Sequence, residues 1–391
     1  MSYKQLVTSK KHETKDDQEH IYYNIQINNI YRNTEAPIVA QVNDQTSTIL
    51  SKQSDYECTV TFWSLRGQMP VFICPVAEGT NANINLTPFG VSYSFGGLDY
   101  PAQVVFVPET YLLSLPLPKA PNSNNGIQDL QTNPTYYYVW TFQDFLDMVN
   151  TALNTAYIAF NAVNPGVHNS PVWFQYDSET GLISLIAEYS YANQAGADVF
   201  CNYLLLNYFE AIQVYFFCYD QVNFKDFRFI MDHDFTNRNA YALPGATIPL
   251  PPAPPAYIQM QQEYECRYTW ANIRSILFTS SSIQTRDEFI PQINNPNAFS
   301  NNQTNNFNPN FLNILSYYDI IFDSSGTSGA NWRQYLFYNP QIYRWLDLVS
   351  DDPLRSFNIN IYLQLTNGQL VPLLLPVNNS VDIKLLFRKK K

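Results

Sequence analysis

Apolar and polar residues alternate most regularly at the start of the segment from residue 357 to residue 388. Five apolar residues, each followed by a polar one, occupy every second position: Phe357, Ile359, Ile361, Leu363 and Leu365. A period of two places these side chains on one face of a β-strand. Asn367-Gly368 follows directly, and this dipeptide favours a two-residue hairpin turn. The pattern therefore predicts a strand with a buried face and a tight turn.

The chain then returns through a second apolar run that ends at Leu375. Pro372 within that run suits an edge strand, because proline cannot donate a hydrogen bond to a neighbouring strand. Alternation resumes with Val381, Ile383, Leu385 and Phe387. We predict that the three runs form a β-meander.

Short apolar runs separated by turn residues predict most of the other elements as strands. Those before residue 110 are Ile21–Ile30, Pro37–Val42, Tyr56–Leu65, Val71–Val76, Val91–Phe95 and Gln103–Val107. Later ones are Val172–Tyr176, Leu182–Ala187, Ile212–Cys218, Phe227–Met231, Tyr257–Gln262, Ile276–Ser280, Ile314–Phe322, Trp332–Tyr338 and Tyr343–Val349. Closely spaced short strands are typical of antiparallel sandwiches and barrels.

One segment has the spacing of a helix. Thr141 is the expected N-cap, and Asp144 occupies the capping-box position three residues later. Phe142, Phe145, Leu146, Val149 and Leu153 then form an apolar stripe. We predict a helical insertion near residues 141–160, and a weaker helix over Ala197–Leu206.

A proline-rich segment at residues 244–256 is the predicted domain boundary. Asp55-Tyr56-Glu57-Cys58 before it resembles Glu263-Tyr264-Glu265-Cys266 after it. A similarity this short arises easily by chance, but its position on both sides of the proline-rich segment is also what tandem copies of one sandwich would give. The expected organisation is mainly β, with two sandwich lobes in tandem. A disordered polar arm covers residues 1–19, the first lobe residues 20–243 and the second lobe residues 257–391.

The composition suits equally a protein whose surface contacts other proteins and an ordinary aromatic-rich β domain. Aromatic residues make up 16% of the chain and charged residues only 14%, a balance typical of interfaces. A net charge of −11 argues against a surface that binds nucleic acid as a whole. The exception is the basic C-terminal tail, Arg388, Lys389, Lys390 and Lys391. A basic tail of this kind can touch a nucleic acid or a membrane surface. The alternative is a solvated end without a partner.

The five cysteines are scattered and form no disulfide framework, which favours buried thiols and synthesis in a reducing compartment. No apolar run reaches the length of a membrane span or of a signal-peptide core, so we expect a soluble protein made inside the cell.

Motifs of catalysis are absent from the sequence, including phosphate-binding glycine loops, nucleophile elbows and zinc-binding HExxH. Asp232, His233 and Asp234 could offer metal ligands, but residues of this kind near a strand end are usually turn formers. The expectation is therefore no catalytic, cofactor-binding or metal site, no cofactor and no enzymatic activity.

Several blocks resemble the capsid proteins of small eukaryotic DNA viruses, namely polinton-like viruses, virophages and their relatives. The blocks are Tyr343–Arg355, Ile383–Lys389, Trp270–Glu288, Tyr136–Ala152 and Pro171–Ile186. This resemblance implies a jelly-roll protein that assembles with itself and with other capsid proteins into an icosahedral shell. It implies trimers if the chain carries two jelly rolls, as in major capsid proteins, and pentamers if it carries one, as in penton or minor proteins.

The resemblance also implies that the protein resides in the virion and is made in the host cytoplasm. For a protein of such a shell, we predict that the basic tail Arg388–Lys391 faces the inside, where it meets genome phosphates or an acidic neighbour. Two other classes remain open from the residues alone. One is a glycan-binding β-sandwich that uses exposed Tyr and Trp as platforms, and the other is a hydrolase with a β-sandwich fold.

Overall fold

The computed structural model describes residues 4–15, 18–28, 39–43, 48–66, 70–75, 86–107, 136–139, 141–192, 196–220, 222–231, 238–241, 243, 256–264, 270, 272–285, 289–293, 307–319, 335–338, 343–366, 368, 370–373 and 380–391. These residues form two compact units. Unit 1 contains the described residues of Met1–Pro70 and Asn272–Lys391, and unit 2 contains those of Val71–Glu109 and Asn133–Ala271. Unit 2 is therefore inserted into unit 1 in the order of the chain.

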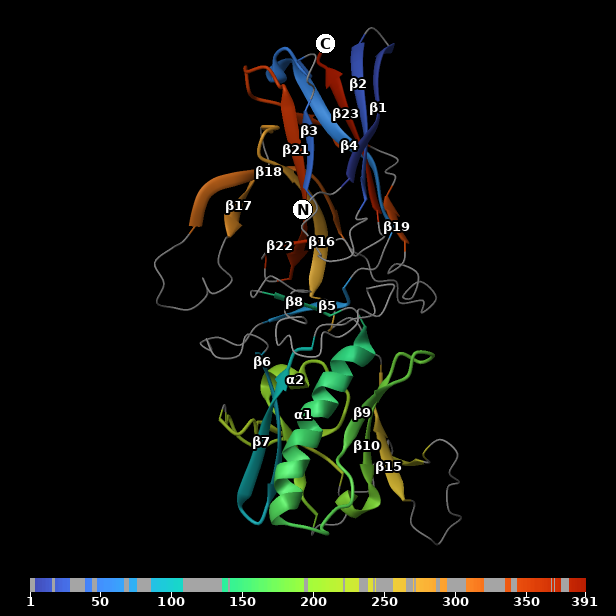
Figure 1. The fold of residues 1–391 in the computed structure, drawn as a ribbon, viewed down its shortest axis with the longest axis vertical. Helices are drawn as coiled ribbons and strands as arrows, with labels where there is room; N and C mark the ends of the chain where they lie inside the picture. Colours follow the sequence, from blue (N-terminus) through green and yellow to red (C-terminus); the bar gives the residue numbers. More distant parts are fainter. Residues whose placement is uncertain are drawn as a thin grey trace. The chain divides into compact units, whose positions relative to one another are not determined.

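The first sheet of unit 1 joins strands from the two halves of that unit. Its members are β1 (Lys4–Lys15), β2 (Gln18–Asn28), β4 (Tyr56–Arg66), β19 (Tyr335–Tyr338), β20 (Leu346–Asp347) and β23 (Ser380–Lys389). They run in the order β1-β2-β23-β4-β19, with β20 also paired to β4, and every pairing is antiparallel. Figure 1 shows the red β23 between the blue strands β2 and β4.

The second sheet of unit 1 contains β3 (Val39–Asn43), β16 (Ile273–Ser280), β17 (Phe289–Ile293), β18 (Phe307–Asp319), β21 (Ser356–Leu365) and β22 (Leu370–Pro372). Its order is β17-β18-β16-β21-β22. β3 pairs with the first half of β21 and β22 with the second half. The side of β21 away from β16 is thus shared by two short strands.

Aromatic side chains join the two sheets of unit 1 into a sandwich. The ring of Tyr23 in β2 lies 5.3 Å from that of Phe357 in β21. Trp63 in β4 lies 5.5 Å from both Phe278 in β16 and Tyr318 in β18. Ring pairs at these separations contribute packing energy beyond the area that they bury.

The strand order of unit 1 is that of a jelly roll. Without the outer strands β1, β17, β20 and β22, the facing sheets are β2-β23-β4-β19 and β3-β21-β16-β18. Along the chain the strands cross from one sheet to the other as two Greek keys do, which defines the eight-stranded jelly roll. The predicted jelly-roll sandwich is therefore confirmed in unit 1.

The segment predicted to be a disordered arm instead supplies an edge strand. β1 pairs with β2 from Lys4↔Asn28 to Lys15↔Gln18, so the described residues of this segment lie in strands and the prediction of a disordered arm was wrong for them. Polarity was a poor guide here because an edge strand buries little and tolerates charge, and lysines on an edge also discourage pairing with other chains.

The predicted meander is only partly correct. β21 and β22 form the expected hairpin, in which Gly368 has a φ of +84° and its N–H donates to the Leu365 carbonyl at 2.9 Å. Pro372 does lie in an edge strand. β23, however, pairs with β2 and β4 in the first sheet. Alternation identifies a strand with one buried face, but both sheets of a sandwich offer such a face.

Unit 2 is built from shorter strands. They are β5 (Phe72–Pro75), β6 (Leu86–Phe95), β7 (Leu98–Val105), β8 (Tyr136–Val139), β9 (Trp173–Tyr176), β10 (Ile183–Glu188), β11 (Asp198–Cys201), β12 (Val214–Phe216), β13 (Phe227–Phe229), β14 (Arg238–Tyr241) and β15 (Tyr257–Gln261). The sheet orders are β12-β13-β11-β6-β7, β14-β15-β10-β9 and β5-β8.

The helix α1 (Phe142–Val163) packs against β6, β7 and β9 and organises the core of unit 2 (Figure 1). Thr141 accepts a hydrogen bond from the Asp144 N–H, and its hydroxyl donates to the Asp144 carboxylate, which confirms the predicted cap. The predicted stripe is buried throughout: Phe142, Phe145, Leu146, Val149 and Leu153. At the start of the helix Phe145 and Trp270 lie 5.3 Å apart, and near its end Tyr93 stacks on Phe160.

The second predicted helix, Ala197–Leu206, divides into two elements. β11 pairs with β6, and only one helical turn follows, α2 (Tyr203–Leu206), whose N-cap is Asn202. The β-forming residues Val199, Phe200 and Cys201 complete the sheet, so tertiary pairing outweighs the local helical spacing. Two short 3₁₀ turns, Gln53–Asp55 and Tyr189–Ala192, complete the described elements.

The predicted boundary at residues 244–256 differs from the observed division. β14 and β15 lie on either side of this segment and pair with each other, and β15 also pairs with β10. The segment thus connects two strands of one sheet within unit 2. The two lobes are present, but they are nested where tandem lobes were expected. Proline content does not distinguish a linker between domains from a loop within one.

The internal similarity does not correspond to a structural repeat. Tyr56 is buried in β4 of unit 1, whereas Tyr264 is exposed beyond the end of β15 in unit 2.

Candidate functional surfaces

The described residues hold no group of three or more His, Cys, Asp or Glu side chains that could bind a metal ion. Asp232, His233 and Asp234 lie outside the described residues. None of the described helices has both the length and the apolar character needed to cross a membrane.

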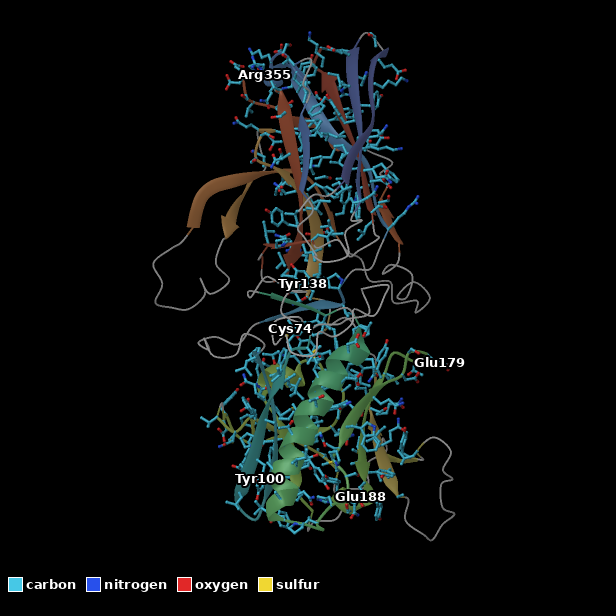
Figure 2. The ribbon with its side chains drawn as sticks, viewed as in Figure 1. Cys74, Tyr100, Tyr138, Glu179, Glu188 and Arg355 are labelled. Atoms are coloured by element: carbon cyan, nitrogen blue, oxygen red, sulfur yellow. The ribbon has the colours of Figure 1, made fainter. Side chains whose placement is uncertain are left out.

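His168 is a buried histidine with structural partners in unit 2. Its Nε2 accepts a hydrogen bond from the Ala197 N–H at 2.9 Å, so Nδ1 carries the proton and donates to Ser190 Oγ at 2.7 Å. The ring stacks on Tyr191 at 3.5 Å. Burial lowers the pKa of His168 to about 4, and the nearby Glu188, labelled in Figure 2, partly opposes this shift. A neutral ring that holds two chain segments is not placed for proton transfer to a substrate.

The predicted basic tail is mostly part of the jelly roll. Arg388 and Lys389 lie inside β23, which extends further than the sequence suggested. The Arg388 guanidinium donates to Glu57 Oε2 at 2.6 Å and lies 3.8 Å from the centre of the Trp345 ring. Lys390 Nζ lies 3.0 Å from Asp347 Oδ1 and donates to the Ser54 carbonyl at 3.0 Å. Arg388 and Lys390 therefore have carboxylate partners within unit 1, while Lys391 is exposed.

More hydrogen bonds and ion pairs of this kind surround the same end of unit 1. Asp351 lies 3.1 Å from Lys52 Nζ and accepts a 2.6 Å hydrogen bond from Ser54 Oγ. These contacts lower the pKa of Asp351, with the Ser54 hydroxyl as the larger cause. The Lys390 N–H also donates to the Asp55 carbonyl. We call the ion pairs Arg388–Glu57, Lys390–Asp347 and Lys52–Asp351 the charged end of unit 1.

Unit 2 presents a contrasting surface along β12, the edge strand of its five-stranded sheet. Six large apolar side chains are exposed there, and we call them the β12 patch: Tyr203, Tyr215, Phe216, Phe217, Tyr219 and Val222. Their exposed fractions range from 47% to 80%. Sequence reasoning predicted the strand at Ile212–Cys218 but missed this surface. The signal was the run Val214–Tyr219, which contains no charged residue.

Aromatic rings cover both faces of this edge. On one face Phe216 lies 5.4 Å from Phe227 and 5.2 Å from Tyr219. On the other face Phe217 lies 5.3 Å from the buried Phe200. Lys225 Nζ lies 5.1 Å from the Phe217 ring, and the Arg228 guanidinium lies 5.6 Å from that of Tyr215. The edge is therefore apolar, with cations placed over its rings.

The architecture and these surfaces define a class of protein. Jelly rolls of this kind build viral capsid and lectin domains, and the described residues present a charged end on unit 1 and an aromatic patch on unit 2. The class is that of the eight-stranded jelly-roll proteins.

Within this class the sequence identifies the family. Residues 21–389 match the family model of the Sputnik minor capsid protein V18/19. Because the match covers nearly the whole chain, the protein belongs to this family. The chain is 27% identical to structural protein V19 of Sputnik virophage over 223 residues, which are 56% of this chain and 94% of the relative. It is 32% identical to protein V18 of the same virophage over 132 residues, 33% of this chain and 75% of the relative.

Two solved structures resemble the whole chain. A protein in the 3.5 Å cryo-EM structure of the Sputnik virophage aligns with a TM-score of 0.67 and 26% identity, over 95% of this chain and 98% of that one. The crystal structure of the mavirus penton protein aligns with a TM-score of 0.54 over 94% of this chain and 98% of that one. Its identity is 14%, so this second match concerns the fold alone.

These findings confirm the resemblance to virophage capsid proteins and the prediction of a viral structural protein. They support the capsid role over the glycan-binding alternative. They also place the chain among structural proteins of the virion, with no enzyme among the relatives named above.

Proposed function

We propose that the chain is a minor capsid subunit that forms pentamers with copies of itself and meets other capsid proteins in an icosahedral shell. The observation that carries this proposal is the strand order of unit 1, which makes one complete jelly roll from the two ends of the chain. In the viruses that the sequence resembles, one roll implies the pentameric type and two rolls imply the trimeric type. The family match over residues 21–389 supports the same role.

The proposal includes synthesis in the host cytoplasm and the absence of enzymatic activity. Cys58, Cys74, Cys201 and Cys218 are free thiols, as expected for a protein made in a reducing compartment.

The basic tail enters the proposal in a restricted form. We expect Lys391, and the end of β23 with it, to face the interior of the shell and to meet genome phosphates or an acidic neighbour. Arg388 and Lys390 contribute less to such a contact, because their charges are partly neutralised by Glu57 and Asp347.

Mass photometry of the purified full chain over a range of concentrations tests the oligomeric state. We expect a species of five subunits that dissociates reversibly on dilution. A trimer would overturn the pentamer and keep a shell-forming role, whereas a monomer at every concentration up to that of assembly would overturn self-assembly itself. The same measurement in high salt gives the electrostatic share of the association.

A further inference from the structure

The loop that carries the β12 patch is held rigidly. The Asp226 carboxylate accepts hydrogen bonds from the Asp220 N–H at 2.7 Å and from the Tyr203 N–H at 2.8 Å. Phe224 adopts a φ of +56°, and its ring lies against the backbone of Gly90, where a Cβ atom would collide with it. A surface that is already ordered loses little conformational entropy when it binds a partner.

Among the described residues, no strand pairs with the side of β12 that faces away from β13. The Phe217 N–H donates to the Asp226 carbonyl and the Ile230 N–H to the Gln213 carbonyl, so residues 213 and 217 turn their hydrogen-bonding groups towards β13. Successive residues of an antiparallel strand alternate in this respect. The N–H and C=O groups of Val214 and Phe216 therefore point to the free edge.

β12 lacks the residue types that discourage pairing at other edge strands of the protein. Proline and lysine on an edge strand discourage pairing with another chain. β7, at the opposite edge of the same sheet, contains Pro101, β22 contains Pro372, and β1 carries several lysines. The run Val214–Tyr219 contains neither residue type. An unguarded aromatic edge on a soluble protein indicates a surface that is covered in the assembled state.

Charge at the patch favours a copy of the same chain as the partner. Each copy carries a net charge of −11, so two copies repel each other unless they meet at a neutral surface. Lys225 Nζ lies 2.7 Å from Asp99 Oδ1, and Arg228 lies 2.9 Å from Asp198 Oδ1. The Asp220 carboxylate accepts hydrogen bonds from the Val222 and Asn223 N–H groups. The charges around the rings are thus paired or turned into the loop.

The area of the patch is sufficient for a stable contact. Large aromatic side chains have about 150–250 Å² of surface each. With the fractions exposed here, the six residues of the patch offer roughly 700 Å². A standard protein interface buries about 800 Å² on each partner.

From these observations we propose that the β12 patch of one copy packs against the neighbouring copy within the oligomer. This inference rests on the proposed self-assembly and names a surface that mediates it. Fivefold rings need a head-to-tail contact, in which the patch meets a different surface of the next copy. The aromatic rings supply most of the contact area, and the open backbone of β12 adds hydrogen bonds.

Cys218 is a natural reporter for this contact, because it lies between Phe217 and Tyr219 and is partly exposed. The test alkylates the full chain with a maleimide and quantifies each cysteine by peptide mass spectrometry, in the oligomer and after dilution to the monomer. We expect Cys218 to react at least tenfold more slowly in the oligomer. The buried Cys201 reports whether unit 2 stays folded.

A double variant, Phe216→Ser with Tyr219→Ser, removes two rings of the patch. The single variant Tyr264→Ser is its control. Tyr264 is 58% exposed, close to the 56% of Phe216, but follows β15 of the other sheet. We expect the double variant to raise the dissociation constant of the oligomer at least tenfold, and the control to leave it within twofold. Protection of Cys201 in both variants shows that the effect is not one of unfolding.

Three results would overturn the inference. One is an oligomer in which Cys218 reacts as fast as in the monomer. Another is a double variant that associates like the parent, which leaves the proposed function intact. The third is Cys218 protection that appears only when another capsid protein is added, which assigns the patch to that protein. A parent chain that never associates would instead overturn the proposed function.

Discussion

Unit 1 and unit 2 differ in how many large apolar side chains they expose to solvent. Unit 1 buries its aromatic rings between two facing sheets and pairs its charges at one end, as Arg388 does with Glu57. Among the described residues, its exposed large apolar side chains are Tyr317, Tyr343 and Val349. Unit 2 packs its sheets around a helix and leaves many more apolar side chains in solvent, including the whole β12 patch. Under the proposed function, the contrast assigns the jelly-roll scaffold to unit 1 and much of the contact surface between copies to unit 2.

If the two units are stabilised by separate cores, removing a core side chain should destabilise only the unit that contains it. Two buried tryptophans, one in each unit, give the largest expected effect. Trp270 is 1% exposed in unit 2, where its Nε1 donates to the Tyr208 carbonyl at 2.8 Å. Trp63 is 2% exposed in unit 1. We expect Trp270→Ala and Trp63→Ala each to destabilise its own unit by about 3–5 kcal/mol.

Buried cysteines distinguish the two effects, with Cys58 in unit 1 and Cys74 and Cys201 in unit 2. Thiol labelling in increasing urea should expose Cys74 and Cys201 first in Trp270→Ala, and Cys58 first in Trp63→Ala. Simultaneous labelling of all three thiols in both variants would show that the units unfold as one.

Acid should destabilise unit 2 more than unit 1, because the buried His168 lies in unit 2. Its folded-state pKa of about 4 lies below the ordinary value of 6.5. The unfolded chain therefore binds the proton more readily, so the contribution of His168 to stability is complete above pH 6.5 and is lost as the pH falls towards 4. We expect unit 2 to lose about 2 kcal/mol between pH 7 and pH 5.

The measurement is urea unfolding followed by Cys201 labelling at the two pH values. His168→Gln is the matched variant, because an amide can still accept from the Ala197 N–H but does not titrate. If His168→Gln shows the same loss between pH 7 and pH 5 as the parent, another group is responsible.

The smallest expected effect concerns the charged end of unit 1. Lys390→Gln removes the contact with Asp347, and we expect it to destabilise unit 1 by about 1 kcal/mol or less, because the pair is partly exposed. Lys391→Gln removes the same charge without that contact, and should leave stability unchanged while reducing nucleic acid bound at low salt. Urea unfolding and a filter-binding assay at several salt concentrations separate the two roles. Equal nucleic-acid binding by Lys391→Gln and the parent at every salt concentration would remove the tail from the proposed function.

Local patterns in the sequence were sufficient for the elements that depend on neighbouring residues. The cap at Thr141, the buried stripe of α1 and the turn at Gly368 all follow from short-range chemistry. The pairing partners did not follow, because β23 has the same alternation whether it joins β22 or lies between β2 and β4. The nesting of unit 2 within unit 1 is likewise a matter of long-range pairing.

The candidate surfaces also depend on contacts between residues that are distant in the chain, which local patterns do not predict. The basic residues of the tail were visible in the sequence, but their partners Glu57 and Asp347 are distant in the chain and become neighbours only through the sheet. The aromatic residues of the β12 patch contributed to the high aromatic content of the sequence, but the content does not show which of them are exposed. Only the edge position of β12 shows that Tyr215, Phe216 and Phe217 remain in solvent.

The position of β23 also has a consequence for how the protein is made. The ribosome completes β2 and β4 early, yet the strand that belongs between them is synthesised only after the whole of unit 2. Unit 2 can therefore reach its fold during translation, while the first sheet of unit 1 waits with an open gap. Since late, long-range pairing is slow and exposes strand edges, a chaperone that shields β2 and β4 on the nascent chain would raise the yield of intact subunits. Chains released before β23 would lack the central strand of the sheet and be excluded from the shell.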